Sequence, residues 1–128
     1  MARKSVAVAL LPLVLAACGS GHDRRPVPTR AEFVAAANAI CTKAKTRTGR
    51  VARLRALRPP GGTDDLFPRW LKAELDALKV VTPSDEPPDP DAPPASVRLA
   101  IAQGKIAGYA HRLGAEECAR SATGTLRP

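Results

Sequence analysis

Apolar side chains recur at the spacing of one helix face over three long stretches of the chain. The first stretch, residues 30–57, follows the capping-box sequence Thr29-Arg30-Ala31-Glu32 and is stopped by Pro59-Pro60-Gly61-Gly62. The second spans residues 64–81 and the third residues 95–113, where Gly114 fits a left-handed C-terminal cap. The pattern therefore predicts an all-α protein, a small bundle of three helices.

Two further segments lack helical periodicity. Residues 82–94 contain six prolines and four acids, which predicts a long, extended and exposed linker before the last helix. Residues 119–128 are expected to form a disordered tail. Residues 29–118 then make one helical domain, in the size range where a covalent crosslink adds needed stability.

Residues 1–17 have the parts of an export signal. Arg3 and Lys4 precede an uncharged apolar run that is too short to span a membrane as a helix. The run closes on Leu15-Ala16-Ala17-Cys18, which resembles the lipobox of bacterial lipoproteins. The resemblance implies a lipoprotein signal peptide over residues 1–17 that is cut before Cys18. It also implies a diacylglyceryl group on Cys18 that holds the protein to the membrane, and residues 18–28 then read as a flexible tether. We expect a lipid-anchored protein on the extracytoplasmic side of the cell membrane. The alternative is an ordinary secretory signal and a freely secreted protein.

Once Cys18 is assigned to lipid, Cys41 and Cys118 remain as a pair in an oxidising compartment, which predicts a disulfide. Two free thiols or a metal site are the alternatives. Only His22 and His111 could complete a metal site, and neither has ligand spacing, so no metal is expected.

A disulfide needs its Cα atoms within about 7 Å, which constrains the topology. If residues 30–57 form one unbroken helix, the linker must run the length of the bundle so that the last helix descends antiparallel to the first. We favour this crossover. The competing solution breaks the first helix at Gly49 and gives a four-helix fold with short hairpins.

Residues 37–41 (Ala-Asn-Ala-Ile-Cys) and 113–118 (Leu-Gly-Ala-Glu-Glu-Cys) resemble the corresponding segments of small, uncharacterised actinobacterial helical lipoproteins with one disulfide. The resemblance implies location and fold and says nothing of activity.

The formal net charge is +8, and it falls to about +6 without Arg3 and Lys4. Eight Lys and Arg residues but one acid lie between Arg30 and Arg58. A helical wheel places most of them away from the apolar stripe, which predicts a basic binding face of Lys43, Arg47, Arg50 and Arg53. Such a face would attract an anionic envelope polymer or a protein partner. The alternative is a solvated face, partly balanced by the acids of the linker. Nucleic acid is not expected in this compartment.

Motifs for catalysis are missing from the sequence: it has no Gly-x-Ser-x-Gly, no phosphate-binding Gly loop and no His-Glu-x-x-His. We therefore expect a protein that is not an enzyme and needs no cofactor.

A second hypothesis is a carrier, sensor or inhibitor that binds an apolar ligand in a groove between helices, with Trp70 and Tyr109 at its lip. The simpler interpretation of Trp70 is that it anchors the core. A small hydrolase or metal protein built on His111 with Glu116 or Glu117 is the third.

Overall fold

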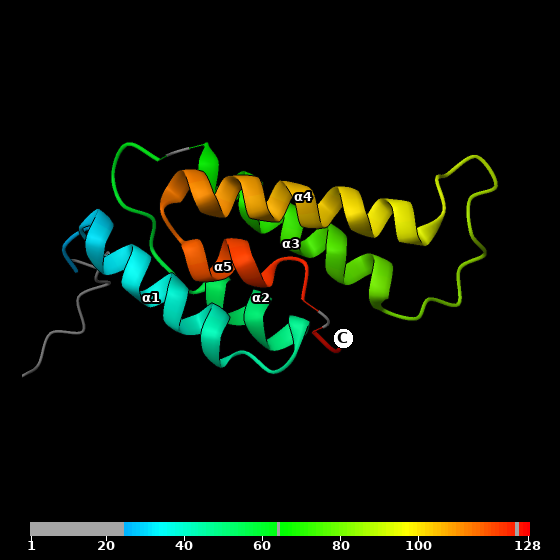
Figure 1. The fold of residues 1–128 in the computed structure, drawn as a ribbon, viewed down its shortest axis with the longest axis horizontal. Coiled ribbons are helices and arrows are strands. Elements are labelled where there is room, and N and C mark those ends of the chain that lie inside the picture. The colour runs from blue at the N-terminus through cyan, green and yellow to red at the C-terminus, as the bar shows by residue number, and fades with distance from the viewer. Residues whose placement is uncertain (1–24, 64, 125) are drawn as a thin grey trace, which may run out of the picture.

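A computed structural model describes residues 25–63, 65–124 and 126–128, and these residues form five α-helices. Figure 1 shows how the helices are arranged. The helices are α1 (Arg30–Lys43), α2 (Arg47–Arg55), α3 (Leu66–Val81), α4 (Ala95–Leu113) and α5 (Glu116–Ser121). The predicted all-α class is confirmed. The proposed signal peptide and Cys18 lie outside the described residues. Within the described ranges, no helix is long and apolar enough to cross a membrane.

The first predicted helix is two helices, because a second N-terminal cap interrupts it. Thr29 and Glu32 form the expected capping box at the start of α1, with Thr29 N donating to Glu32 Oε2 at 2.7 Å. Helix α1 ends at Lys43, and Thr46 Oγ1 then accepts a hydrogen bond from Gly49 N at 3.1 Å, which caps α2. A Cβ at Gly49 would lie 3.0 Å from that hydroxyl, so glycine allows the close approach. The preferred unbroken helix is wrong, and the alternative break lies at residues 44–46 instead of at Gly49.

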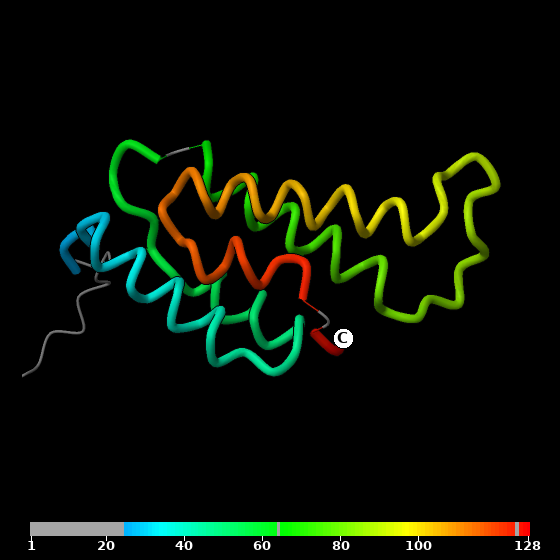
Figure 2. Tube along the Cα trace, in the orientation of Figure 1, coloured from blue at the N-terminus to red at the C-terminus, as the bar shows by residue number. Residues whose placement is uncertain are grey.

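Helices α3 and α4 pack against each other as an antiparallel hairpin, and the linker of residues 82–94 joins their adjacent ends as an exposed loop (Figures 1 and 2). The predicted crossover along the bundle is therefore wrong. Only an unbroken first helix required this crossover, and the division into α1 and α2 removes the requirement. The last long helix has the predicted bounds, and Gly114 at φ +87° provides the predicted left-handed cap.

Gly114 reverses the chain into α5, a helix that the periodicity did not indicate. Helix α5 packs against α1 and α4 and places Cys118 beside the last turn of α1. Cys41 and Cys118 form the predicted disulfide, with 5.1 Å between their Cα atoms. The ordered domain extends beyond the predicted boundary at Cys118, because α5 continues to Ser121 and Arg127 O accepts a hydrogen bond from Arg47 N at 2.8 Å.

The core combines three aromatic rings with many small side chains. Phe33 meets Phe67 edge to face at 5.2 Å between ring centroids, and Phe67 meets Trp70 at 6.0 Å. Trp70 has no exposed surface, which confirms its interpretation as a core anchor. Alanines contributed by α1, α3 and α4 let the helices approach closely around these rings: Ala37, Ala73, Ala77, Ala102 and Ala110.

Candidate functional site

The inner face of α2 carries two arginines. Three residues separate α1 from α2, so the orientation of α2 is not the one that a continuous helix would have. Arg47, Arg50, Val51 and Leu54 all turn inward and are buried. Arg47 is 2% exposed and Arg50 is 0% exposed, so neither can belong to the basic binding face that the sequence predicted. That prediction is corrected for these two residues.

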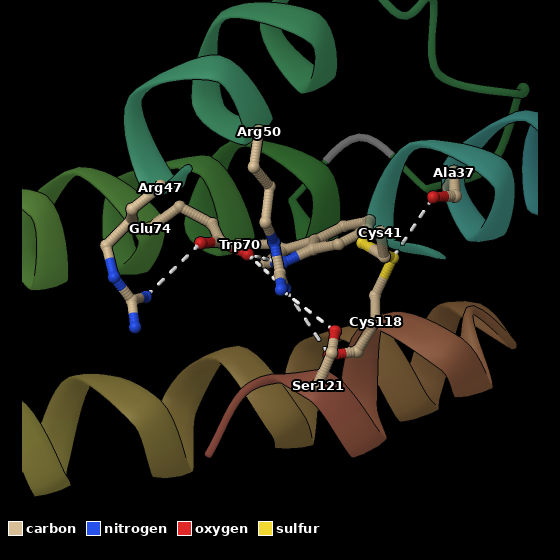
Figure 3. Close-up of polar contacts among 8 residues, drawn as sticks. All are labelled: Ala37, Cys41, Arg47, Arg50, Trp70, Glu74, Cys118 and Ser121. Carbon is tan, nitrogen blue, oxygen red and sulfur yellow. Dashed lines mark hydrogen bonds and ion pairs between the residues drawn. A yellow bond between two sulfur atoms is a disulfide. The ribbon is translucent and has the colours of Figure 1, made fainter. Parts of the chain in front are cut away.

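Arg50 joins α2 to both α3 and α5 (Figure 3). Its Nη2 lies 2.7 Å from Glu74 Oε1 on α3, and neither side chain is exposed. Its Nη1 donates to Ser121 Oγ at 2.9 Å, and Nη2 also approaches Cys118 O at 3.4 Å. The Arg50 guanidinium therefore bonds to three groups, two of which belong to α5, the helix that contains Cys118.

The Glu74 carboxylate is contacted by three side chains of this polar cluster, those of Arg50, Trp70 and Arg47. Trp70 Nε1 donates to Glu74 Oε1 at 3.1 Å, and Arg47 Nη1 lies 3.9 Å from Glu74 Oε2. Two buried guanidinium groups face one buried carboxylate, which leaves the cluster with one excess positive charge. Arg47 Nε and Nη1, Arg50 Nε and Glu74 Oε2 have no hydrogen-bond partner within the described part of the chain. The cluster is close to the disulfide, where Cys118 Sγ touches Ala37 O at 3.3 Å without a hydrogen to donate.

Burial changes the acidity of Arg47. Desolvation lowers the pKa of its guanidinium, the charge of Glu74 opposes this effect, and the charge of Arg50 adds to it. Arginine nevertheless stays protonated over the range in which proteins are folded. The two guanidinium groups are therefore fixed internal charges and are not suited to proton transfer.

The remaining basic residues of this region form an exposed surface. We define the basic surface as the exposed Lys and Arg side chains at the end of α1, on the outer face of α2 and just beyond it: Lys43, Lys45, Arg53, Arg55 and Arg58. None of the five is paired with a carboxylate within the described ranges, although Arg58 Nη1 donates to Arg25 O at 2.6 Å. Two members of the predicted basic face, Lys43 and Arg53, thus remain available to a partner.

The acidic linker does not neutralise this surface. Residues 82–94 form the loop at the far end of the α3–α4 hairpin, which extends beyond α1 and α2 (Figure 1). Asp85, Glu86, Asp89 and Asp91 are all exposed on that loop. The linker acids therefore lie away from the basic surface, and the balance considered from the sequence is not achieved by contact with it.

The predicted groove lip is not formed by Trp70 and Tyr109. Trp70 is fully buried and Tyr109 is half-buried. An open surface hollow of about 800 Å³ lies elsewhere, between the segment before α1 and the segment after α2. Phe33, Leu57 and several prolines line it together with Arg25, Glu32 and Arg58, so its wall is mixed in polarity. Trp70 and Tyr109 do not contribute to it.

One pair from the hydrolase or metal hypothesis does come together. His111 Nδ1 lies 2.8 Å from Glu116 Oε1, across the turn from α4 to α5. Both side chains are exposed to solvent, and Glu117 instead pairs with Arg120. No group of three metal-binding side chains converges anywhere in the described ranges. An exposed His–Glu contact of this kind does not by itself indicate a catalytic site.

The buried role of Glu74 was not predicted, although its position in the sequence contains a signal. Phe67, Trp70, Glu74 and Ala77 follow the spacing of one helix face, and all four are buried. A carboxylate at the centre of one buried stripe and arginines at the centre of a neighbouring one indicate an internal ion pair.

Comparison with protein-family models, with curated proteins and with solved structures finds no match to this chain.

Proposed function

We propose that the protein is a lipid-anchored, non-enzymatic helical module on the extracytoplasmic side of the cell membrane, and that its basic surface binds an anionic component of the envelope. Export and anchoring rest on the sequence of residues 1–18, in which Cys18 would carry the diacylglyceryl group. The helical domain is stapled by a disulfide, as suits a protein outside the cytoplasm.

The unpaired, exposed cations of the basic surface carry the binding proposal. Five exposed cations lie between residues 43 and 58 with no carboxylate paired to them in the described part of the chain, while the linker acids lie on the loop that joins α3 to α4. A local excess of exposed positive charge raises the local concentration of anionic ligands and speeds their association. Phosphate-rich polymers and anionic headgroups share the chemistry that this surface would recognise.

Binding to the isolated anionic wall polymer and to phosphatidylglycerol vesicles would test the proposal. The intact protein is compared with a variant in which Arg53, Arg55 and Arg58 are changed to Gln. We expect the affinity to fall about tenfold or more in the variant and to fall steeply as salt is raised, because exposed charges are screened beyond about 10 Å at 0.1 M. Comparison of the two ligands distinguishes a polymer from a lipid headgroup.

A charge-matched control lies on α3. Arg69, Lys72 and Lys79 are exposed on that helix, so their change to Gln removes the same net charge from another face. An equal loss of affinity in the two variants, or binding that does not respond to salt, would contradict a specific basic surface. Replacement of Cys18 by Ser should separately release the protein from the membrane fraction, and an unchanged membrane fraction would contradict the anchor.

A further inference from the structure

The outer face of α4 exposes apolar side chains to solvent. Val97 is 45% exposed and Ile101 is 50% exposed, whereas Ala102, Ile106, Ala110 and Leu113 of the same helix are buried. Gly104 and Gly108 follow at the next positions of the exposed row, and an added Cβ at either would meet no heavy atom within 4 Å. We call Val97, Ile101, Gly104 and Gly108 the apolar row.

The spacing of the apolar row is that of a helix-packing face. Successive members are four, three and four residues apart, which is the repeat by which one helix packs along another. Each glycine in a solvated helix costs up to about 1 kcal/mol relative to alanine, and the structure shows no contact that compensates. Glycines four residues apart instead allow the backbone of a second helix to approach closely.

A second row of like charge runs beside the first. Arg98, Lys105 and Arg112 are exposed, are spaced seven residues apart, and fall next to the apolar row on a helical wheel. None of the three is paired with a carboxylate within the described ranges. Together the two rows extend for about 22 Å along α4, at 1.5 Å per residue.

We propose that this face of α4 docks an amphipathic helix of a partner protein whose apolar face is flanked by acidic residues. The apolar row supplies the packing surface and the basic row sets the required charge of the partner. Because Ala95–Leu113 contains no acid, two copies of α4 paired through this face would provide no counter-charge for Arg98, Lys105 and Arg112. The row also has only two large apolar side chains, too few for firm insertion into a bilayer. The face lies on a different element from the basic surface of α1 and α2, so this proposal does not depend on the proposed function.

Two synthetic peptides that differ only in charge would test the proposal. Both are three-heptad helices with Leu at positions a and d; one has Glu and the other Lys at positions e and g. We expect the Glu peptide to bind the intact protein and to shift the amide resonances of residues 97–112, and the Lys peptide not to bind. Absence of binding by the Glu peptide, equal binding of the two peptides, or shifts that map to another element would overturn the proposal.

Variants of α4 sharpen the test because every altered position is exposed. Changing Gly104 and Gly108 to Leu should fill the space through which a second helix would approach α4. Binding of the Glu peptide should then weaken about tenfold or more. The matched control is Ala52→Leu, an added side chain at an exposed position of α2. Changing Arg98, Lys105 and Arg112 to Glu should reverse the preference, so that the Lys peptide now binds.

Phosphatidylglycerol vesicles provide the remaining comparison. If they bind through Val97 and Ile101 while the Glu peptide does not bind, the face is a membrane-contacting one and the proposal fails. If Ile101→Glu abolishes peptide binding while circular dichroism shows an unchanged helical fold, the apolar row itself is the docking surface.

Discussion

Arg50 and Glu74 form an ion pair at 2.7 Å in which neither side chain has any exposed surface. Helix α2 is nine residues long and buries only two large apolar side chains, Val51 and Leu54, against the rest of the domain. A salt bridge that also bonds to Ser121 therefore determines how α2 sits against α3 and α5. Charge pairing thus accompanies apolar contact where this helix packs on α3 and α5.

Removal of the carboxylate should strongly destabilise the fold. Glu74→Gln leaves the guanidiniums of Arg47 and Arg50 buried without a counter-charge. Breaking a buried ion pair from one side costs about 3–5 kcal/mol, so we expect the free energy of unfolding in urea to fall by that order. The control is Lys72→Gln, which removes an exposed pair between Lys72 Nζ and Asp76 Oδ2 at 2.8 Å and should cost about 0.5 kcal/mol or less. Similar losses in both variants would show that Glu74 does not neutralise buried charge.

Replacement of the whole cluster should cost far less than removal of one member. We expect Arg47→Leu, Arg50→Met and Glu74→Leu together to leave stability nearly unchanged or higher, because the desolvation of three charges is avoided. The comparison of single, double and triple variants in urea measures the coupling between the charges. If the triple variant loses as much stability as the sum of the single variants, the charges act independently and the ion-pair account is wrong.

The capping residues correctly predicted the start of α1 and the end of α4. Thr29, Glu32 and Gly114 act locally, within a few residues of the chain, and the structure shows each of them in its expected role. The disulfide also followed from the sequence, because only two cysteines remained once Cys18 was assigned to lipid. Local hydrogen bonding and residue counting were sufficient for these features.

The orientation of α2 could not be predicted in the same way. Thr46 can cap a helix or lie on the outside of one, and tertiary packing decides between the two. Once the helix restarts at Arg47, Arg50 turns from the surface to the interior. Arg47 and Arg50 are excluded from the predicted binding face for that reason, whereas Lys43 and Arg53 remain exposed.

Loss of the disulfide should destabilise the domain without abolishing its helices. It closes a loop over a sequence separation of 77 residues, and the chain-entropy account assigns such a crosslink about 4 kcal/mol. We expect the variant with Cys41 and Cys118 both changed to Ala to show this loss in urea unfolding. Helix α5 should exchange its amide hydrogens fastest, since the disulfide holds it to α1. Faster exchange in α4 than in α5 would contradict this order.

Exposed glycines of α4 should be stabilising positions for alanine. No heavy atom lies within 4 Å of an added Cβ at Gly104 or Gly108, so each change to Ala should raise the free energy of unfolding by about 0.5–1 kcal/mol. Gly114→Ala is the matched control, because its φ of +87° is unfavourable for any side chain even though the nearest atom, Val34 Cγ2, is 3.5 Å away. That variant should lose about 1 kcal/mol or more. Thermal unfolding of the three variants measures the difference, and a gain at Gly114 would contradict the cap.

The capping box of α1 should make the stability of the domain depend on pH. Hydrogen bonds from the Thr29 backbone and side chain lower the pKa of Glu32 from its ordinary 4.5. Because the folded state binds this proton less readily than the unfolded state, the contribution of Glu32 is complete above its ordinary pKa and is lost as pH falls through the lowered value. The urea midpoint of the wild type should therefore decrease between neutral and acid pH by more than that of Glu32→Gln, whose side chain can occupy the same position in the box without titrating. Parallel pH profiles for the two proteins would mean that the carboxylate of Glu32 does not stabilise the start of α1.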